Sequence, residues 1–130
     1  MSLMANPMDA LRSYQQALDA GMPVDPNELD ADYLKRSGEV AGAKRFDYVK
    51  LIDGQVQALA MFVEEEPHNR VARFCLAYAV SENNRGRGLA VEAINKGIED
   101  LRKQFSLAGV KSFYVEALIL GVKYQHNFYK

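Results

Sequence analysis

The chain has 130 residues, of which 48% are hydrophobic and 25% are charged, and its net charge is −1. This length is near the commonest domain size and suffices to bury a core, so we expect a single domain over residues 1–130. The near-neutral charge argues against a nucleic-acid binder, which needs a basic face, and no apolar run approaches the ~18 residues of a membrane span. The lone cysteine, Cys75, has no disulfide partner and the amino end has no signal pattern, so we expect a cytoplasmic protein.

The first part of the chain predicts two helices and a loop. Asn6 is a suitable N-cap before proline, and Gly21 can end the helix that follows. Residues 25–28 resemble a capping box, which predicts a second helix with Tyr33 on its apolar side. Residues 37–44 are rich in glycine and alanine and predict a loop.

The middle of the chain predicts three strands. Residues 45–52 and 55–63 are joined by Asp-Gly at 53–54, which is among the strongest short hairpin signals. Residues 64–69 predict a polar turn into a third strand, residues 70–80, whose almost continuous apolar sequence is typical of a central strand covered on both faces. Four residues of the second strand are expected to alternate onto one face: Val56, Ala58, Ala60 and Phe62.

The last part predicts a βαβ unit. Residues 87–105 have an apolar stripe at helical spacing, and residues 111–120 form a further strand. A strand, a helical crossover and another strand make the two strands parallel. Residues 122–130 have helical character, with Tyr124 and Phe128 four residues apart.

The segment Arg85–Ala90, between the third strand and this helix, is the strongest functional signal. Gly86 and Gly88 let a ligand come close to the backbone, and the helix that follows directs unpaired N–H groups and the positive end of its dipole toward it. A phosphate or pyrophosphate ligand is therefore expected. The dinucleotide fingerprint is excluded because Val91 stands where its third glycine is needed, and the Gly-Lys-Ser/Thr of a nucleotide-triphosphate loop is absent.

Arg85–Ala90 fits the pattern Arg/Gln-x-x-Gly-x-Gly/Ala, which resembles the acetyl-coenzyme A pyrophosphate loop of the GNAT N-acetyltransferase superfamily. The predicted element order is similar to that fold over residues 45–130 and loosely so over residues 6–36. The resemblance implies an α/β fold: a mixed, mostly antiparallel sheet with a central parallel βαβ unit and helices on both faces. Two alternative interpretations of Arg85–Ala90 remain open: a tight turn with two solvated arginines, and an Arg-Gly segment that binds nucleic acid.

The chain departs from the family pattern in three ways. No first strand is evident before the first helix, and the chain stops at Phe128–Lys130, where family members continue into further strands. These departures suggest a truncated chain, a divergent member, or a partner that supplies the terminal strands. Gly121 and Val122 also stand where the family often has an asparagine that contacts the cofactor.

The resemblance implies acetyl-coenzyme A as co-substrate and an amine-bearing acceptor, with no metal. The amine attacks the thioester directly, which requires a held cofactor, a base for the amine and an acid for the thiolate. The strand end would hydrogen-bond the pantetheine arm and the thioester oxygen, and the loop would bind the pyrophosphate. The implied cofactor-binding residues are Tyr78, Ala79, Val80, Arg85, Gly86, Arg87, Gly88, Leu89 and Ala90.

The resemblance also implies an acid. Tyr129 lies in a Phe-Tyr-Lys setting like the family's acidic tyrosine, with Tyr124 in reserve; the alternative is a ring packed on the sheet. Glu116 is a carboxylate within an apolar strand, so it is a candidate base whose pKa burial would raise, or a salt-bridged strand residue. His68 and His126 have no spaced partners, which gives no support for a metal or a triad.

Three functions follow from these residues. The first is an N-acetyltransferase, and the second is a non-catalytic module of the same fold that binds coenzyme A, another phosphorylated ligand or a protein. The third is an unrelated phosphate-binding α/β domain. Because an incomplete sheet leaves an unpaired edge that favours pairing with another chain, a homodimer is also expected.

Overall fold

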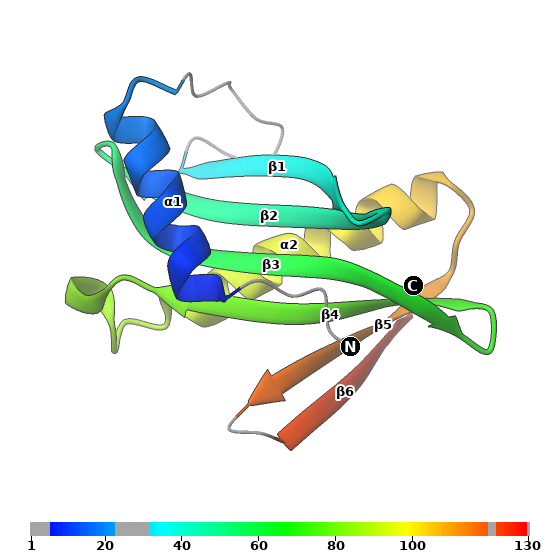
Figure 1. Cartoon of the computed structure of the whole chain (residues 1–130). Helices are drawn as coiled ribbons and strands as arrows, with labels where there is room; N and C mark the ends of the chain where they lie inside the picture. Colours follow the sequence, from blue (N-terminus) through cyan, green and yellow to red (C-terminus); the bar gives the residue numbers. More distant parts are fainter. Residues whose placement is uncertain (1–5, 23–31, 120–121, 130) are drawn as a thin grey trace.

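A computed structural model describes residues 6–22, 32–119 and 122–129, with side chains up to Ala117. In this part of the chain the strands form one six-stranded sheet in chain order, with β4 and β5 parallel and all other neighbours antiparallel (Figure 1). No helix within it is long and apolar enough to cross a membrane. The elements are α1 (Pro7–Asp19), β1 (Tyr33–Val40), β2 (Ala43–Ile52), β3 (Gln55–His68), β4 (Val71–Val80), the 3-10 helix η1 (Glu82–Asn84), α2 (Leu89–Leu107), β5 (Ser112–Ile119) and β6 (Val122–Tyr129).

The two helices cover opposite faces of the sheet, so the expected mixed sheet with a central βαβ unit and helices on both faces is confirmed. In Figure 1 α1 crosses in front of the sheet and α2 lies behind it. Strand alternation explains the two layers, because successive side chains of β3 point to opposite faces. The cluster under α1 includes Leu11, Leu34, Val49, Leu59 and Met61. The cluster under α2 includes Tyr48, Phe62, Phe74, Leu101 and Phe113.

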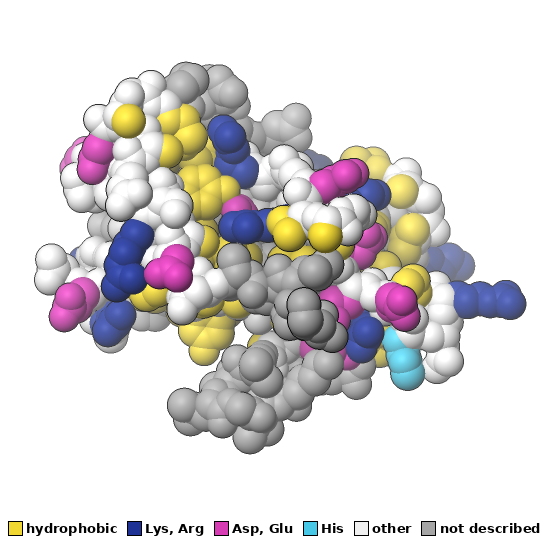
Figure 2. All heavy atoms as spheres, viewed as in Figure 1, with side chains coloured by type: hydrophobic (Ala, Val, Ile, Leu, Met, Phe, Trp, Pro, Cys, Tyr) yellow, Lys and Arg dark blue, Asp and Glu magenta, His cyan; other side chains and the backbone are white. Residues whose placement is uncertain are grey.

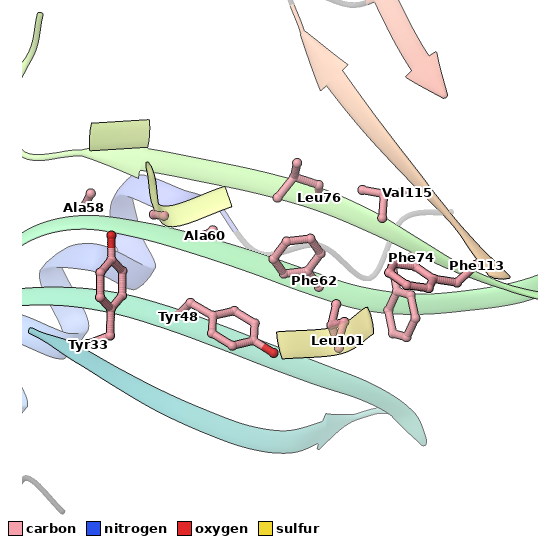
Figure 3. Packing of buried hydrophobic residues seen from close by; sticks show 11 residues of the cluster. Tyr33, Tyr48, Ala58, Ala60, Phe62, Phe74, Leu76, Leu101, Phe113 and Val115 are labelled. Carbon is pink, nitrogen blue, oxygen red and sulfur yellow. The ribbon is translucent and has the colours of Figure 1, made fainter. Parts of the chain in front are cut away.

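The cluster under α2 is rich in aromatic residues (Figure 3). The helix α2 approaches the sheet closely at Gly97. A Cβ atom on Gly97 would lie 2.3 Å from a ring carbon of Phe62 and 2.9 Å from one of Tyr48, so only glycine fits. The ring of Tyr48 packs edge-on against Phe62, with centroids 5.7 Å apart. Its hydroxyl donates to the buried carboxylate of Asp100 in α2 at 2.7 Å, and Lys35 of β1 lies 2.6 Å from the same oxygen. This polar contact fixes α2 over β1 and β2.

The predicted loop at 37–44 is wrong. Tyr33–Val40 and Ala43–Ile52 pair as a hairpin with Ala41 and Gly42 at its turn, both with positive φ. The predicted second helix is also wrong from Tyr33 onward, because β1 begins there; its start at 25–28 lies outside the described residues. Alanine rarely adopts positive φ, so the turn carries little of the usual sequence signal.

The Asp53–Gly54 hairpin is confirmed, with positive φ at both turn residues. The predicted common face of four β3 residues is wrong at one end. Leu51 pairs with Val56 whereas Lys50 pairs with Ala58, so Gln57 is an extra residue in a β-bulge. The bulge places Val56 in the cluster under α1, while Ala58, Ala60 and Phe62 lie under α2.

The predicted turn at 64–69 is shorter than expected. β3 continues to His68, and only Asn69 and Arg70 have the positive φ values of the turn. The predicted helix at 122–130 is wrong as well, because 122–129 form β6, which pairs with β5 from Ile119↔Val122 to Ser112↔Tyr129. The described part of the sheet therefore has an additional antiparallel strand where a helix was expected.

Candidate functional site

The loop between β4 and α2 is built as the sequence predicts. η1 follows β4, and Gly86 and Gly88 both adopt positive φ, at 79° and 73°. Gly88 is the N-cap of α2, which begins at Leu89 and therefore two residues later than predicted. A Cβ atom on either glycine would meet nothing within 4 Å, so the loop faces open space. Here the glycines serve the backbone conformation and leave room beside it.

The N–H groups of this loop are available. No side chain caps α2, and no described residue accepts a hydrogen bond from the backbone N–H of Gly86, Gly88 or Leu89. The loop is braced from behind: the Asn84 side chain donates to Oγ of Ser81 at 2.6 Å and accepts from Arg87 at 3.3 Å. A braced loop with exposed amides at a helix N-terminus suits an anion such as pyrophosphate.

β4 and β5 separate just before this loop. Their pairing runs from Arg73↔Tyr114 to Leu76↔Ala117, and no further pair joins the described residues of the two strands. β4 nevertheless stays paired with β3 as far as Val80, so it is β5 that diverges. Figure 1 shows the two strands opening toward the end of β4 that carries η1. We call this opening the β4–β5 gap.

The edge of β4 presents backbone groups to the β4–β5 gap. The Ser81 N–H donates to the Gln57 carbonyl at 2.9 Å. Ala58 and Val80 are therefore a non-hydrogen-bonded pair of β3 and β4, and the backbone N–H and C=O groups of Val80 point away from β3. Val80 and, by alternation, Tyr78 therefore direct their backbone groups toward the gap, whereas those of Ala79 point to β3. The Val80 carbonyl accepts from Nε of Arg85 at 3.3 Å, which leaves the Tyr78 groups and the Val80 N–H facing the gap.

Glu116 lies one residue before the β4–β5 gap. It is opposite Cys75 in the register and is 4% exposed. Nη1 of Arg73 lies 3.2 Å from Oε1 of Glu116, and the same arginine donates from Nε to the Glu66 carbonyl at 2.9 Å. The structure therefore places the candidate base near the gap and in an ion pair. Sequence reasoning missed Arg73. Its signal is a charged residue within the otherwise apolar run of β4.

The two candidate acids lie at different levels of β6. Tyr129 pairs with Ser112, at the start of β5 and thus at the far end of the sheet from the loop. Tyr124 pairs with Ala117, the residue at which β4 and β5 separate. The backbone thus brings the reserve candidate Tyr124, and not Tyr129, level with the gap.

A second polar cluster lies under α1, and sequence reasoning missed it. Asp47 of β2, 3% exposed, accepts two bonds from Arg45, at 2.9 and 3.0 Å, and one from the Tyr14 hydroxyl at 2.5 Å. Burial and the Asp47 carboxylate raise the pKa of Tyr14 well above its ordinary value, and the bond to Asp47 raises that of Arg45. An aspartate between Phe46 and Tyr48 is the same signal that singled out Glu116.

His68, the histidine whose side chain the structure describes, packs edge-on against Tyr114, with ring centroids 5.6 Å apart. Among the described residues no three His, Cys, Asp or Glu side chains gather as a metal site would require. The acidic run at 64–66 lies within β3, and its first member, Glu64, accepts from the Lys44 N–H at 3.4 Å.

The comparisons with known proteins show a distant likeness to solved structures and nothing nearer. No family model matches the sequence, and no curated protein does. Among solved structures the chain is similar to an acetyl transferase of Salmonella typhimurium that modifies the N-terminal serine of the 50S ribosomal subunit protein L7/L12. The identity is 16% and the TM-score 0.34, and the match covers 55% of this chain and 39% of that one.

Proposed function

We propose that this chain is an N-acetyltransferase that binds acetyl-coenzyme A and transfers the acetyl group to an amine. The observation that carries the proposal is a conjunction: free loop amides at Gly86–Leu89 lie at the open end of the β4–β5 gap, and β4 turns unpaired backbone groups into that gap. A pyrophosphate on the loop and an extended, amide-bearing arm along β4 would satisfy both sets at once. A ligand with only a phosphate would use the loop alone.

The reaction proposed for this site is a direct transfer of the acetyl group. The acceptor nitrogen attacks the thioester carbon, a tetrahedral oxyanion forms, and the C–S bond then breaks to release the thiolate. The N–H of Tyr78 or Val80 faces the gap and would donate to the oxyanion. The amine loses one proton to a base, and the thiolate gains one from an acid, so charge and protons balance.

The acid and the base are assigned by position. Tyr124 is at the level of the gap and is proposed as the acid in preference to Tyr129, whose register position lies at the opposite end of β5. Glu116 is proposed as the base, acting on the acceptor directly or through a water, since it lies next to the gap.

A second candidate is supported by the same residues. The carboxylate of Glu116 is already paired with Arg73, and the helix expected to carry Tyr129 is a strand. Both observations favour a module that binds coenzyme A without turnover. The two candidates share the loop and the gap and differ only in chemistry.

The test is a melting-temperature screen with acetyl-coenzyme A, coenzyme A and ADP, followed by an acetylation assay on a panel of amines. A ligand at 100 times its dissociation constant stabilises the fold by about 2.7 kcal/mol. Gly88→Asp is expected to abolish this gain, because it puts a side chain and a negative charge beside the loop amides. Gly42→Asp is the matched control, since Gly42 also has positive φ and open space but lies in the β1–β2 turn.

Each outcome separates the alternatives. Binding of acetyl-coenzyme A with acetylated product supports the transferase, and binding without any product supports the module. Equal stabilisation by ADP and coenzyme A would show that the arm makes no use of the gap and would overturn both.

A further inference from the structure

A cavity of about 550 Å³ lies between α1 and the hairpin of β1 and β2, and its lining includes no residue of β4, β5 or the loop before α2. Its walls are mainly apolar, and it lies next to the buried Tyr14–Asp47–Arg45 cluster. Figure 2 shows apolar surface beside α1, with both basic and acidic side chains next to it. The apolar lining residues are Ala10, Ala17, Met22 and Val40. The volume is within the range of small-molecule sites.

The positive and negative side chains that line this cavity do not all pair with one another. Arg36 and Asp47 are opposite each other in the register of β1 and β2, and both line the cavity together with Arg45. Asp47 is fully engaged by Arg45 and Tyr14, and Arg36 makes no ion pair with any described residue. At the rim, Asp9 is paired with Arg12 at 3.4 Å. Glu39 also lines the cavity, but strand alternation directs its side chain to the opposite face from Arg36. Among the described residues that line the cavity, Arg36 is therefore the guanidinium without a carboxylate partner.

We propose that this cavity is a second binding site, independent of the coenzyme A loop, for a small monocarboxylate with an apolar body. The planar guanidinium of Arg36 matches a carboxylate in a two-point hydrogen bond, and the apolar walls would cover the rest of the molecule. A single net positive charge among the described lining residues favours a monoanion, because a phosphate dianion would keep one negative charge uncompensated beside Asp47.

The floor of the cavity is rigid, which suits a specific site. Arg45 is held by two bonds to Asp47 and by a contact of 3.1 Å to the Met61 sulfur, so it cannot swing out to compete for the ligand. Tyr14 is held by Asp47, and its ring remains in the cavity wall. Arg36 is exposed and forms no ion pair with the described residues, so it is the residue that a ligand would order.

The test compares hexanoate with its neutral isostere hexanamide by ¹H–¹⁵N NMR titration. Saturable shifts at Ala10, Ala17 and Val40 are expected with hexanoate and not with hexanamide. Arg36→Gln should weaken hexanoate binding on the order of tenfold, the loss typical of one charged hydrogen-bonded contact. Lys103→Gln, which removes an exposed positive charge of α2 that does not line the cavity, is the control and should leave the affinity unchanged.

Equal binding of the acid and the amide, no saturable shift, or full affinity in Arg36→Gln would overturn the proposal. Its failure is distinguishable from failure of the proposed function, because acetyl-coenzyme A binding is measured by shifts at Gly86–Ala90, which do not line the cavity. Hexanoate binding with no response to acetyl-coenzyme A would support this site and argue against the transferase.

Discussion

The hydroxyl of Tyr14 in α1 donates a 2.5 Å hydrogen bond to the buried carboxylate of Asp47 in β2. This bond and the apolar contacts around it fix α1 on the sheet. Tyr14→Phe should lower the free energy of unfolding by about 2 kcal/mol, since hydrogen bonds to charged groups contribute about 1.5–3 kcal/mol. Urea unfolding measures this loss.

The matched comparison is Asp47→Asn, alone and combined with Tyr14→Phe. If the bond acts as described, the double variant loses less stability than the two single losses added together. Strict additivity would contradict the role given to this pair.

Alkaline pH should destabilise the fold through its buried tyrosines. Burial and the carboxylate of Asp100 raise the pKa of Tyr48 far above its ordinary value of 10, and burial and Asp47 do the same for Tyr14. Above pH 10 the unfolded chain releases protons that the folded chain retains, so stability falls as pH rises, by up to about 1.4 kcal/mol per pH unit for each tyrosine. Unfolding curves between about pH 9 and about pH 11 measure this slope.

Tyr48→Phe should make the fall in stability above pH 10 less steep, because phenylalanine has no proton to release and only the contribution of Tyr14 remains. Its loss of stability near neutral pH is a separate effect, caused by the missing bond to Asp100. An unchanged slope in this variant would contradict the assignment.

The βαβ unit and the loop could be predicted from the sequence because their signals are local. The apolar run of β4, Gly86 and Gly88, and the stripe of α2 each indicate their own conformation, and the helical crossover makes β4 and β5 parallel. The β4–β5 gap could be anticipated only through the family resemblance, since the separation depends on where two distant strands stop pairing.

The predictions from sequence that were wrong or missing also have physical causes. Ala41 adopts positive φ without a turn-forming side chain, which hid the first hairpin. Tyr124 and Phe128 are four apart, which fits a helix, but residues 122–129 also alternate, and pairing with β5 decides for a strand. The bulge at Gln57 reverses the face of Val56 and has no local signal. The Tyr14–Asp47 contact joins residues 33 apart in the chain, so no spacing rule reveals it.

Gly97→Ala should destabilise the protein although alanine is the better helix former. Its new Cβ would lie 2.3 Å from the Phe62 ring, and both Phe62 and Tyr48 are fully buried and cannot retreat. We expect a loss of about 1–3 kcal/mol from overpacking, larger than the helix gain of about 1 kcal/mol. Thermal and urea unfolding measure it.

Gly38→Ala serves as the control for Gly97→Ala, because nothing lies within 4 Å of a Cβ there, and it should change stability little. Phe62→Leu should recover part of the loss in Gly97→Ala by making room. No recovery would mean that the ring is not the obstacle.

Gln15 should protect one particular amide of the sheet. Its Oε1 accepts from the Val56 N–H at 2.7 Å, and its Nε2 donates to the Gly54 carbonyl at 3.1 Å, so a helix side chain holds the β2–β3 turn. Gln15→Ala should speed hydrogen exchange at Val56 by roughly tenfold or more, because the amide loses its acceptor. Gln16→Ala, an exposed neighbour, should leave that exchange rate unchanged; faster exchange in both variants would mean that α1 as a whole has loosened.

Variants of the Arg73–Glu116 pair test whether the buried carboxylate near the β4–β5 gap has a catalytic or a structural role. Removing one partner of a buried ion pair typically costs about 3–5 kcal/mol, because a charge is then buried alone. Arg73→Gln and Glu116→Gln should therefore each destabilise the fold, by about 3 kcal/mol or somewhat less given that Arg73 is 23% exposed.

The double variant separates the two roles. With both charges replaced, much of the lost stability should return, since neither glutamine requires a counter-charge. If Glu116 is the base, acetyl transfer stays low in the double variant although the fold is restored, and the transferase activity of Arg73→Gln exceeds that of Glu116→Gln. If Glu116 only pairs with Arg73, activity returns together with stability. Transfer rates measured beside unfolding curves for the three variants distinguish these outcomes, because a purely structural carboxylate cannot reduce the rate in a protein that folds as well as the original.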